Sequence, residues 1–166
     1  MKTDPTPSRR QFLGWLGVSA AAAGLGVALL ARPAQATAYR VVYSNAEWLK
    51  RLGKARYAVL READTEPPFT SPVNDEHRKG TFSCAGCELP LFSSDTKFES
   101  GTGWPSFWAP IQNAVATSAD NSIFGERTEV HCARSGSHLG HVFEDGPAPT
   151  GLRYCMNGVA LTFAPA

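Results

Sequence analysis

Three of the four cysteines in this sequence form a possible metal site. Cys84 and Cys87 are a C-x-x-C pair, which places two thiolates on one tight turn, and two such pairs give zinc a tetrahedral shell. The second pair should lie at Cys132, but Ser135 stands where its other thiolate is needed. Water or His131 would have to complete the shell of a structural zinc ion. Alternatively, these thiols are free or disulfide-bonded, as an oxidising compartment permits.

The remaining cysteine, Cys155, has neighbours that suit a nucleophile. A reactive thiolate is favoured by a nearby cation, and Arg153 would share a strand face with Cys155 because side chains alternate along strands. His138 and His141 come shortly before it, across a turn that contains Gly and Pro. Each feature alone has an ordinary structural explanation, as a buried thiol or as core histidines. Together they indicate cysteine–histidine chemistry.

An aromatic loop offers a candidate binding surface. Trp104 and Pro105 lie in a run from Gly101 to Trp108 that is rich in aromatic residues. Such a rigid loop either forms a corner of the core or provides a wall for an apolar ligand, for example a thioether methyl group.

Short helices and antiparallel strands have to position these residues. Ser44 and Glu47 form a capping box that begins a helix, Gly53 interrupts it, and Pro67-Pro68 ends any continuation. From Gly80 onward, short apolar or alternating runs are separated by turn residues, which is typical of β structure. We therefore expect a mainly β fold, with two small N-terminal helices packed on antiparallel sheet. The expected strands are 81–83, 89–92, 107–111, 115–117, 123–124, 129–132, 141–143, 151–156 and 159–163, with turns that include Asp120-Asn121.

Residues 1–38 form a targeting segment outside this fold. Arg9-Arg10 precedes an uncharged run rich in Ala and Gly, from Phe12 to Ala31, which resembles a twin-arginine export signal. Two A-x-A cleavage signals follow, the first of them ending at Ala36. The alternative is a retained membrane anchor, because about 20 uncharged residues can span a bilayer. We expect residues 39–166 to form one domain that is exported to the periplasm, or held at the membrane if the signal is retained.

The charge of the chain argues against a nucleic-acid partner. The 166 residues include 16 Lys or Arg and 15 Asp or Glu, for a net charge of +1. Residues 39–166 alone carry 12 basic and 14 acidic side chains. A weakly acidic domain lacks the excess positive charge that attracts phosphates. We expect a soluble monomer with a single core.

The motifs as a set resemble those of the B-type peptide methionine-(R)-sulfoxide reductases. The resemblance runs from about Ser44 to Phe163, and so many ordered segments are far more specific than C-x-x-C or H-x-x-H alone. It implies a fold of two antiparallel sheets with small flanking helices. The matching segments are Cys84–Cys87, Phe92–Phe98, Gly103–Ser106, His138–Phe143, Gly146-Pro147 and Pro149–Asn157.

The resemblance also implies a role for each matching residue. Cys155 would attack the sulfoxide sulfur and end as a sulfenic acid, while His141 would protonate the sulfoxide oxygen. His138 and Asn157 would help to hold that oxygen, and Trp104 would pack against the methyl group and so select the R epimer. The other residues expected at the substrate site are Phe143, Arg153, which would favour the thiolate, and Asp145, which would orient a histidine.

The expected reaction needs no cofactor, because a thiolate, an imidazole and a chiral pocket supply its chemistry. Oxidised peptides and proteins would be the substrates, and a thioredoxin-like or other envelope thiol protein would supply electrons. The chain departs from the family at Ser135, the missing zinc ligand, and at Thr102, where many relatives carry the cysteine that resolves the sulfenic acid. Our hypothesis is that Cys84, Cys87 or Cys132 resolves it, with an external thiol as the alternative.

Two non-enzymatic functions would also use cysteines and histidines. A zinc or thiol module would need only the first three cysteines and would leave Cys155 inert. An envelope copper- or zinc-binding protein would lose metal affinity when His138 or His141 is changed. The combination of Cys155 with His141 and Trp104 favours the enzyme, because a scaffold has no need of it.

Overall fold

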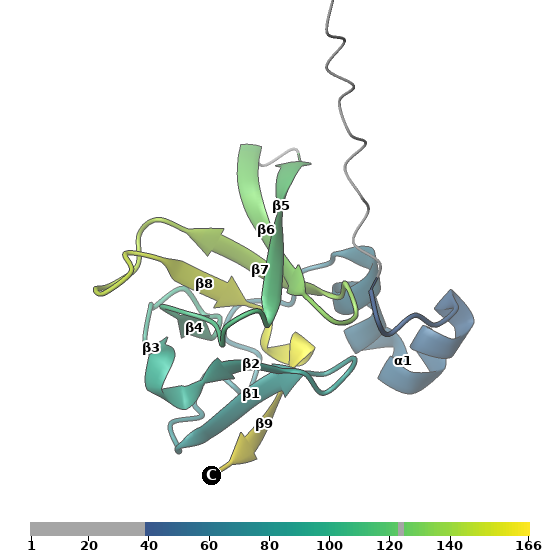
Figure 1. The fold of residues 1–166 in the computed structure, drawn as a ribbon, viewed down its shortest axis with the longest axis horizontal. Helices are drawn as coiled ribbons and strands as arrows, with labels where there is room; N and C mark the ends of the chain where they lie inside the picture. Colours follow the sequence, from purple (N-terminus) through teal and green to yellow (C-terminus); the bar gives the residue numbers. More distant parts are fainter. Residues whose placement is uncertain (1–38, 123–124) are drawn as a thin grey trace, which may run out of the picture. The chain divides into compact units, whose positions relative to one another are not determined.

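The computed structural model describes residues 39–122 and 125–166, which form two antiparallel sheets and a kinked α-helix (Figure 1). The smaller sheet has the strand order β2-β1-β9, and the larger has the order β3-β4-β8-β7-β6-β5. The expected mainly β fold with two antiparallel sheets is confirmed. The strands are β1 Gly80–Cys84, β2 Pro90–Ser93, β3 Lys97–Phe98, β4 Ser106–Phe107, β5 Val115–Ser122, β6 Gly125–Cys132, β7 His138–Phe143, β8 Arg153–Met156 and β9 Leu161–Pro165, and the short 3₁₀ turns are η1 Ser94–Thr96 and η2 Gly158–Ala160.

The helix α1, Asn45–Glu62, consists of two halves that meet at Gly53. The Ser44 hydroxyl accepts a hydrogen bond from the Glu47 amide at 3.3 Å and so caps the first half. Gly53 has φ 71° and ψ 167°, which no helix contains, and glycine adopts such a φ without steric cost. The two expected helices are therefore the two halves of one kinked element.

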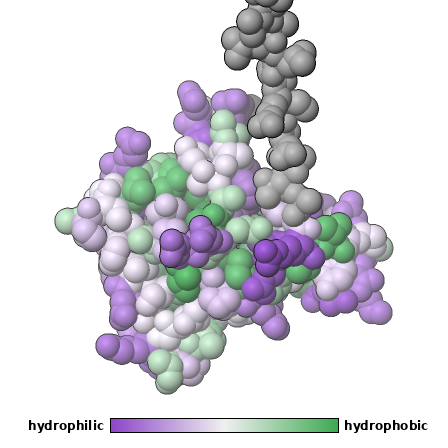
Figure 2. Space-filling model, in the orientation of Figure 1, coloured by the Kyte–Doolittle hydropathy of each residue, from purple (hydrophilic) through white to green (hydrophobic). Residues whose placement is uncertain are grey.

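Three phenylalanines join the two sheets in the core. Phe82 of β1, Phe92 of β2 and Phe107 of β4 are fully buried. The Phe107 ring stacks on Phe92 with centroids 4.3 Å apart and meets Phe82 edge-on at 5.0 Å, both favourable aromatic geometries. These contacts hold β4, and β8 beside it, against the smaller sheet. On the face drawn in Figure 2, apolar side chains are interspersed with polar ones.

The turn expected at Asp120-Asn121 is wrong, because both residues lie within β5. This strand pairs residue by residue with β6 from Val115 opposite Cys132 to Ser122 opposite Gly125. β5 is the outermost strand of the larger sheet, where polar side chains can extend to one side, and Arg127 of β6 donates to Asp120 directly opposite at 2.8 Å. The expected strand 123–124 lies outside the described residues.

The predicted export signal, residues 1–38, also lies outside the part of the chain that the structure describes. The domain boundary expected after residue 38 therefore stays a prediction. Within 39–122 and 125–166, no helix has the length and apolar character that crossing a bilayer requires.

Candidate active site

Cys155 lies near the centre of the larger sheet, in β8. It stands opposite Ser106 of β4 and opposite His141 of β7, and directly opposed residues project from the same face of an antiparallel sheet. A pocket of about 120 Å³ opens beside the Cys155 thiol. Five of the expected site residues line its wall, namely Cys155, His141, Asn157, Trp104 and Phe143.

Both histidines are held by carboxylates of the β5–β6 hairpin. His141 Nε2 lies 2.8 Å from Asp120 Oδ2, and His138 Nδ1 lies 2.7 Å from Glu129 Oε1. An ionised carboxylate can only accept, so each of these ring nitrogens carries a proton. The proton that His141 gains or loses is therefore the one on Nδ1. Sequence reasoning missed both carboxylates, because a cross-strand partner has no fixed spacing along the chain.

The pKa of His141 is lowered from its ordinary value. Burial is the main cause, because it penalises the charged ring. The hydrogen bond to Asp120 acts in the opposite direction, while the positive charges of Arg127 and His138 lower the pKa further. A histidine with this balance is a good proton donor once it is protonated.

His138 stands behind His141, with ring centroids 5.5 Å apart. It is 5% exposed, and its Nε2 is buried without a hydrogen-bond partner among the described residues. His138 is not part of the pocket wall. In this geometry it contacts His141 and Glu129, and contact with the sulfoxide oxygen stays a prediction.

Arg153 is the cation next to Cys155, and Asp145 holds it there. The Arg153 guanidinium donates two hydrogen bonds of 2.8 Å to the two carboxylate oxygens of Asp145. The guanidinium carbon Cζ of Arg153 lies 4.5 Å from the centre of the Phe143 ring. The Asp145 hydrogen bond raises the pKa of Arg153, and Cys155 adds to this effect. The expectation that Asp145 orients a histidine is wrong, because its carboxylate pairs with Arg153 and the histidines pair with other acids.

Thr102 lies beside Cys155. Its hydroxyl lies 3.7 Å from the Cys155 sulfur. Ser100 contacts the hydroxyl of Thr102 at 2.9 Å and that of Ser106 at 2.7 Å. The side of Cys155 that faces Thr102 is thus lined by hydroxyl groups.

The loop that follows α1 braces the pocket, and its half-buried residue Glu66 makes most of the contacts. Its carbonyl accepts from the Trp104 indole N–H at 3.0 Å, and its amide donates to the Asn157 side chain at 3.0 Å. Its carboxylate accepts from the amides of Gly158 and Val159. Asn157 also donates to the Leu139 carbonyl at 3.2 Å, so its amide group joins two segments of the site. Glu66 gave no signal in the sequence beyond its place before Pro67-Pro68.

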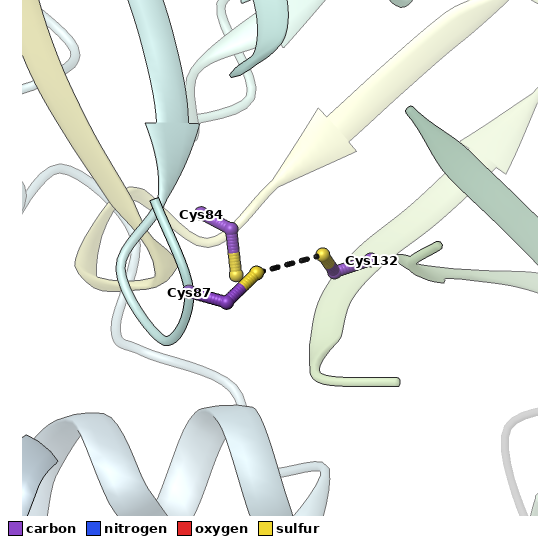
Figure 3. Close-up of side chains that lie close together, drawn as sticks. All are labelled: Cys84, Cys87 and Cys132. Carbon is purple, nitrogen blue, oxygen red and sulfur yellow. Dashed lines mark hydrogen bonds between the residues drawn. The ribbon is translucent and has the colours of Figure 1, made fainter. Parts of the chain in front are cut away.

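The other three cysteines form a separate cluster, drawn in Figure 3. Cys84 ends β1, Cys87 lies in the turn between β1 and β2, and Cys132 ends β6. All three sulfurs lie within 4.8 Å of one another, with Cys87 and Cys132 at 3.5 Å. Sulfurs bound to one tetrahedral zinc stand about 3.8 Å apart, so the three thiolates fit three corners of such a site.

Ser135 lies at the fourth corner of this cluster. Its hydroxyl is 3.8 Å from the Cys84 sulfur and donates to Ser137 at 3.0 Å. Hydrogen bonds from Cys84 and Cys87 lower the pKa of Cys132. Hydrogen bonds with Cys132 and Cys87, together with burial, raise the pKa of Cys84. A zinc ion here would be held by three thiolates and would tie the β1–β2 turn to β6.

Comparison with known proteins assigns the chain to a family. The SelR domain matches residues 52–165. The chain belongs to the SelR family. The motif-based recognition is therefore confirmed, and the SelR domain covers all the site residues described above.

Relatives of this SelR chain match it over most of their length. The peptide methionine sulfoxide reductase MsrB of Agrobacterium fabrum is 49% identical over 78% of this chain and 96% of its own. The MsrB proteins of Methanosarcina barkeri and Pseudomonas putida are 56% and 55% identical over 72% of this chain, and over 85% and 90% of theirs. A solved structure, the Mis18 Yippee-like domain, aligns with 54% of this chain and 98% of its own at a TM-score of 0.44 and 17% identity.

A second family model matches the segment before the SelR domain. It describes the signal sequence of the twin-arginine translocation pathway and covers residues 6–26. The expected twin-arginine signal is confirmed, and it indicates export by that route.

Proposed function

We propose that this chain reduces methionine-R-sulfoxide in peptides and proteins, with Cys155 as the nucleophile and His141 as the acid. The observation that carries the proposal is the pocket in which the Cys155 thiol stands beside His141 and Trp104. The relatives that match most of the chain are peptide methionine sulfoxide reductases by name, which supports the same chemistry.

The first step transfers one oxygen atom from substrate to enzyme. The Cys155 thiolate attacks the sulfoxide sulfur, and a proton from His141 goes to the departing oxygen. The hydroxyl then moves from the substrate sulfur to the Cys155 sulfur while the sulfur–oxygen bond and the new sulfur–sulfur bond break, so the substrate leaves as a thioether and Cys155 is oxidised to a sulfenic acid. Trp104 would contact the substrate methyl group, and the handedness of the pocket would select the R epimer.

The second step returns Cys155 to the thiol, and the geometry favours an external reductant. Cys155 stands opposite His141, which stands opposite Glu129, three residues before Cys132 in β6. Two strand spacings and three residues separate the Cα atoms of Cys155 and Cys132 by about 14 Å, whereas a disulfide needs less than about 7 Å. A thiol from outside would attack the sulfenic acid and release water, and a second thiol would free Cys155.

Substitution of Thr102 tests this second step. In the wild-type protein, one turnover without reductant should leave a Cys155 sulfenic acid that dimedone labels. In Thr102→Cys, whose new sulfur would stand against Cys155, the same turnover should join the introduced sulfur to Cys155 in a disulfide and give no dimedone adduct. A disulfide from Cys155 to Cys84, Cys87 or Cys132 in the wild-type peptide map would contradict the external route.

The export signal sets the compartment of this activity. The proposal places residues 39–166 in the periplasm as a monomeric repair enzyme for exported proteins damaged by oxidation. A thioredoxin-like or other envelope thiol protein would be the reductant. Mass spectrometry of protein from a periplasmic fraction gives its N-terminus. A terminus after Ala36 or Ala38 supports cleavage, and an intact Met1 in the membrane fraction supports the anchored form.

Turnover of separate sulfoxide epimers tests the reaction itself. Full-length protein with dithiothreitol should reduce peptide methionine-R-sulfoxide and leave the S epimer unchanged. Cys155→Ser is the control for reduction of the sulfoxide by dithiothreitol alone. If the folded, fully reduced protein reduces neither epimer, the proposal fails and a thiol or metal-binding module becomes the better explanation.

A further inference from the structure

A second pocket, of about 210 Å³, shares Trp104 with the pocket beside Cys155. Phe69 and Asp75 form one side of it, and Glu99 and the loop from Ser100 to Gly103 form the other. Because Trp104 belongs to both walls, a peptide whose sulfoxide lies against Trp104 has its neighbouring residues within reach of this second pocket. Residues of an extended chain follow one another at about 3.4 Å.

Phe69 is an apolar side chain fixed at the rim of this second pocket. It is 74% exposed, although burial of an aromatic ring is favourable. Its φ is 63°, which a bulky residue adopts only under constraint. The constraint comes from the Trp104 loop, because the Phe69 amide donates to the Gly103 carbonyl at 2.7 Å. A Cβ on Gly103 would come within 2.9 Å of the Phe69 ring, so the ring lies directly over the loop that leads to Trp104.

The charged residues of the second pocket are acidic. Asp75 and Glu99 line it, and none of the described residues in its wall is basic. Two basic side chains contact Glu99 from outside this wall. The Lys97 side chain is 6% exposed, and its ammonium donates to the Asn74 carbonyl at 2.6 Å and to Glu99 at 3.2 Å, while His77 Nδ1 lies 3.8 Å from Glu99 Oε1. The pocket thus combines an exposed aromatic face with carboxylates.

We propose that this pocket binds the side chain of a residue flanking the methionine sulfoxide and prefers lysine or arginine there. The aliphatic stem would lie on the Phe69 ring, and the cationic end would meet Asp75 and Glu99. This inference rests on the proposed reaction and names a class of substrate for it, namely polypeptides with a basic residue one or two positions from the oxidised methionine.

Three substrates test the preference: two peptides that differ only in Lys or Glu beside methionine-R-sulfoxide, and N-acetyl-methionine-R-sulfoxide, which has no flanking residue. The wild-type protein should show a kcat/KM about tenfold higher for the Lys peptide than for the Glu peptide. Phe69→Asn removes the ring, but asparagine tolerates the positive φ, so this variant should reduce the ratio to about twofold. It should keep its rate on the small substrate. Phe69→Tyr should behave like the wild type.

Val42→Ser is the matched control, because Val42 is also 74% exposed and does not line this pocket. Binding of both peptides to Cys155→Ser, followed by tryptophan fluorescence, measures the preference without turnover and separates it from the reaction. Equal affinity for the two peptides would overturn the proposal. So would an equal loss on all three substrates in Phe69→Asn, because it would assign Phe69 to support of the Trp104 loop.

Discussion

The two cysteine centres of this chain differ in what surrounds the sulfur. Cys155 is partly exposed in a pocket, and its neighbours are a histidine, an arginine and a threonine hydroxyl. Cys84 and Cys132 are fully buried, and the polar groups beside them include the Cys87 thiol, the Gly86 amide and the Ser135 hydroxyl. Reactive thiols require access and charge stabilisation, whereas structural thiols require neither.

Because of this difference, we expect Cys155 to react and the Cys84, Cys87 and Cys132 cluster to hold segments of the chain together. A sulfenic acid can form only where a sulfoxide can enter, and the pocket gives Cys155 that access. The three clustered thiols share hydrogen bonds between the β1–β2 turn and β6. We therefore expect changes at Cys155 to act on rate and changes at the cluster to act on stability.

The largest expected effect is the loss of turnover in Cys155→Ser. A serine hydroxyl is a far weaker nucleophile toward sulfur, so kcat/KM should fall at least about a thousandfold, while the melting temperature stays within about 2 °C. Cys132→Ser should show the reverse: a melting temperature lower by about 5–10 °C and a rate within about twofold for the folded fraction. Calorimetry and steady-state kinetics on both variants measure the comparison. Similar rate losses in the two variants would contradict it.

The next effect concerns the pH dependence of kcat. His141 is active as an acid only when protonated, so activity should be present below its pKa and lost as the pH rises through it. Burial lowers that pKa and the Asp120 hydrogen bond raises it, so Asp120→Asn should lower it further and move the fall in kcat to lower pH. At neutral pH the rate should drop about tenfold. Thr117→Ala, at an exposed position elsewhere on β5, is the control, and an unshifted profile in Asp120→Asn would separate His141 from the proton transfer.

A gain of stability is expected when the thiol cluster is completed. Ser135→Cys would place a fourth sulfur at the corner where the hydroxyl now lies 3.8 Å from Cys84. Four thiolates bind zinc more tightly than three, so the variant should retain zinc against EDTA and melt about 5 °C higher. Elemental analysis and calorimetry, with and without chelator, measure both. Ser135→Ala, which removes the same hydroxyl without adding a sulfur, is the matched control, and equal zinc retention in wild type and Ser135→Cys would show that three thiolates suffice.

The smallest effect is expected at Glu66, which braces the active pocket and is not part of the thiol cluster. Glu66→Gln keeps the shape of the side chain but replaces a charged acceptor of the Gly158 and Val159 amides by a neutral one. The free energy of unfolding should fall by about 1–2 kcal/mol, as urea denaturation would measure. Selectivity for the R epimer should fall with it, because the weaker side-chain bonds loosen the Glu66 backbone, whose carbonyl accepts from the Trp104 indole. Unchanged selectivity with lowered stability would make Glu66 a structural residue only.

The residues that line the pocket were predictable from sequence, whereas the charged partners of the histidines were not. Cys155, His141, Trp104 and Asn157 stand in short motifs, and the structure brings them to one pocket. Asp120 and Glu129 pair with the histidines across strands, and such pairs depend on register, which local residue patterns do not give. Because a turn was predicted at Asp120-Asn121, Asp120 was not assigned to a strand, although its contact with His141 depends on its place in β5. Helix boundaries were easier, because Ser44 and Gly53 act within a few residues.

In the larger sheet, the pocket residues and the carboxylates that bind the histidines lie on different strands. Inner strands β7 and β8 carry Cys155 and the two histidines, whereas the hairpin of β5 and β6 at the edge carries the carboxylates that bind the histidine rings. An edge hairpin tolerates substitution better than a central strand. The acidity at which such an enzyme works best can therefore be retuned from the rim of the sheet, with the strands that hold the nucleophile left as they are.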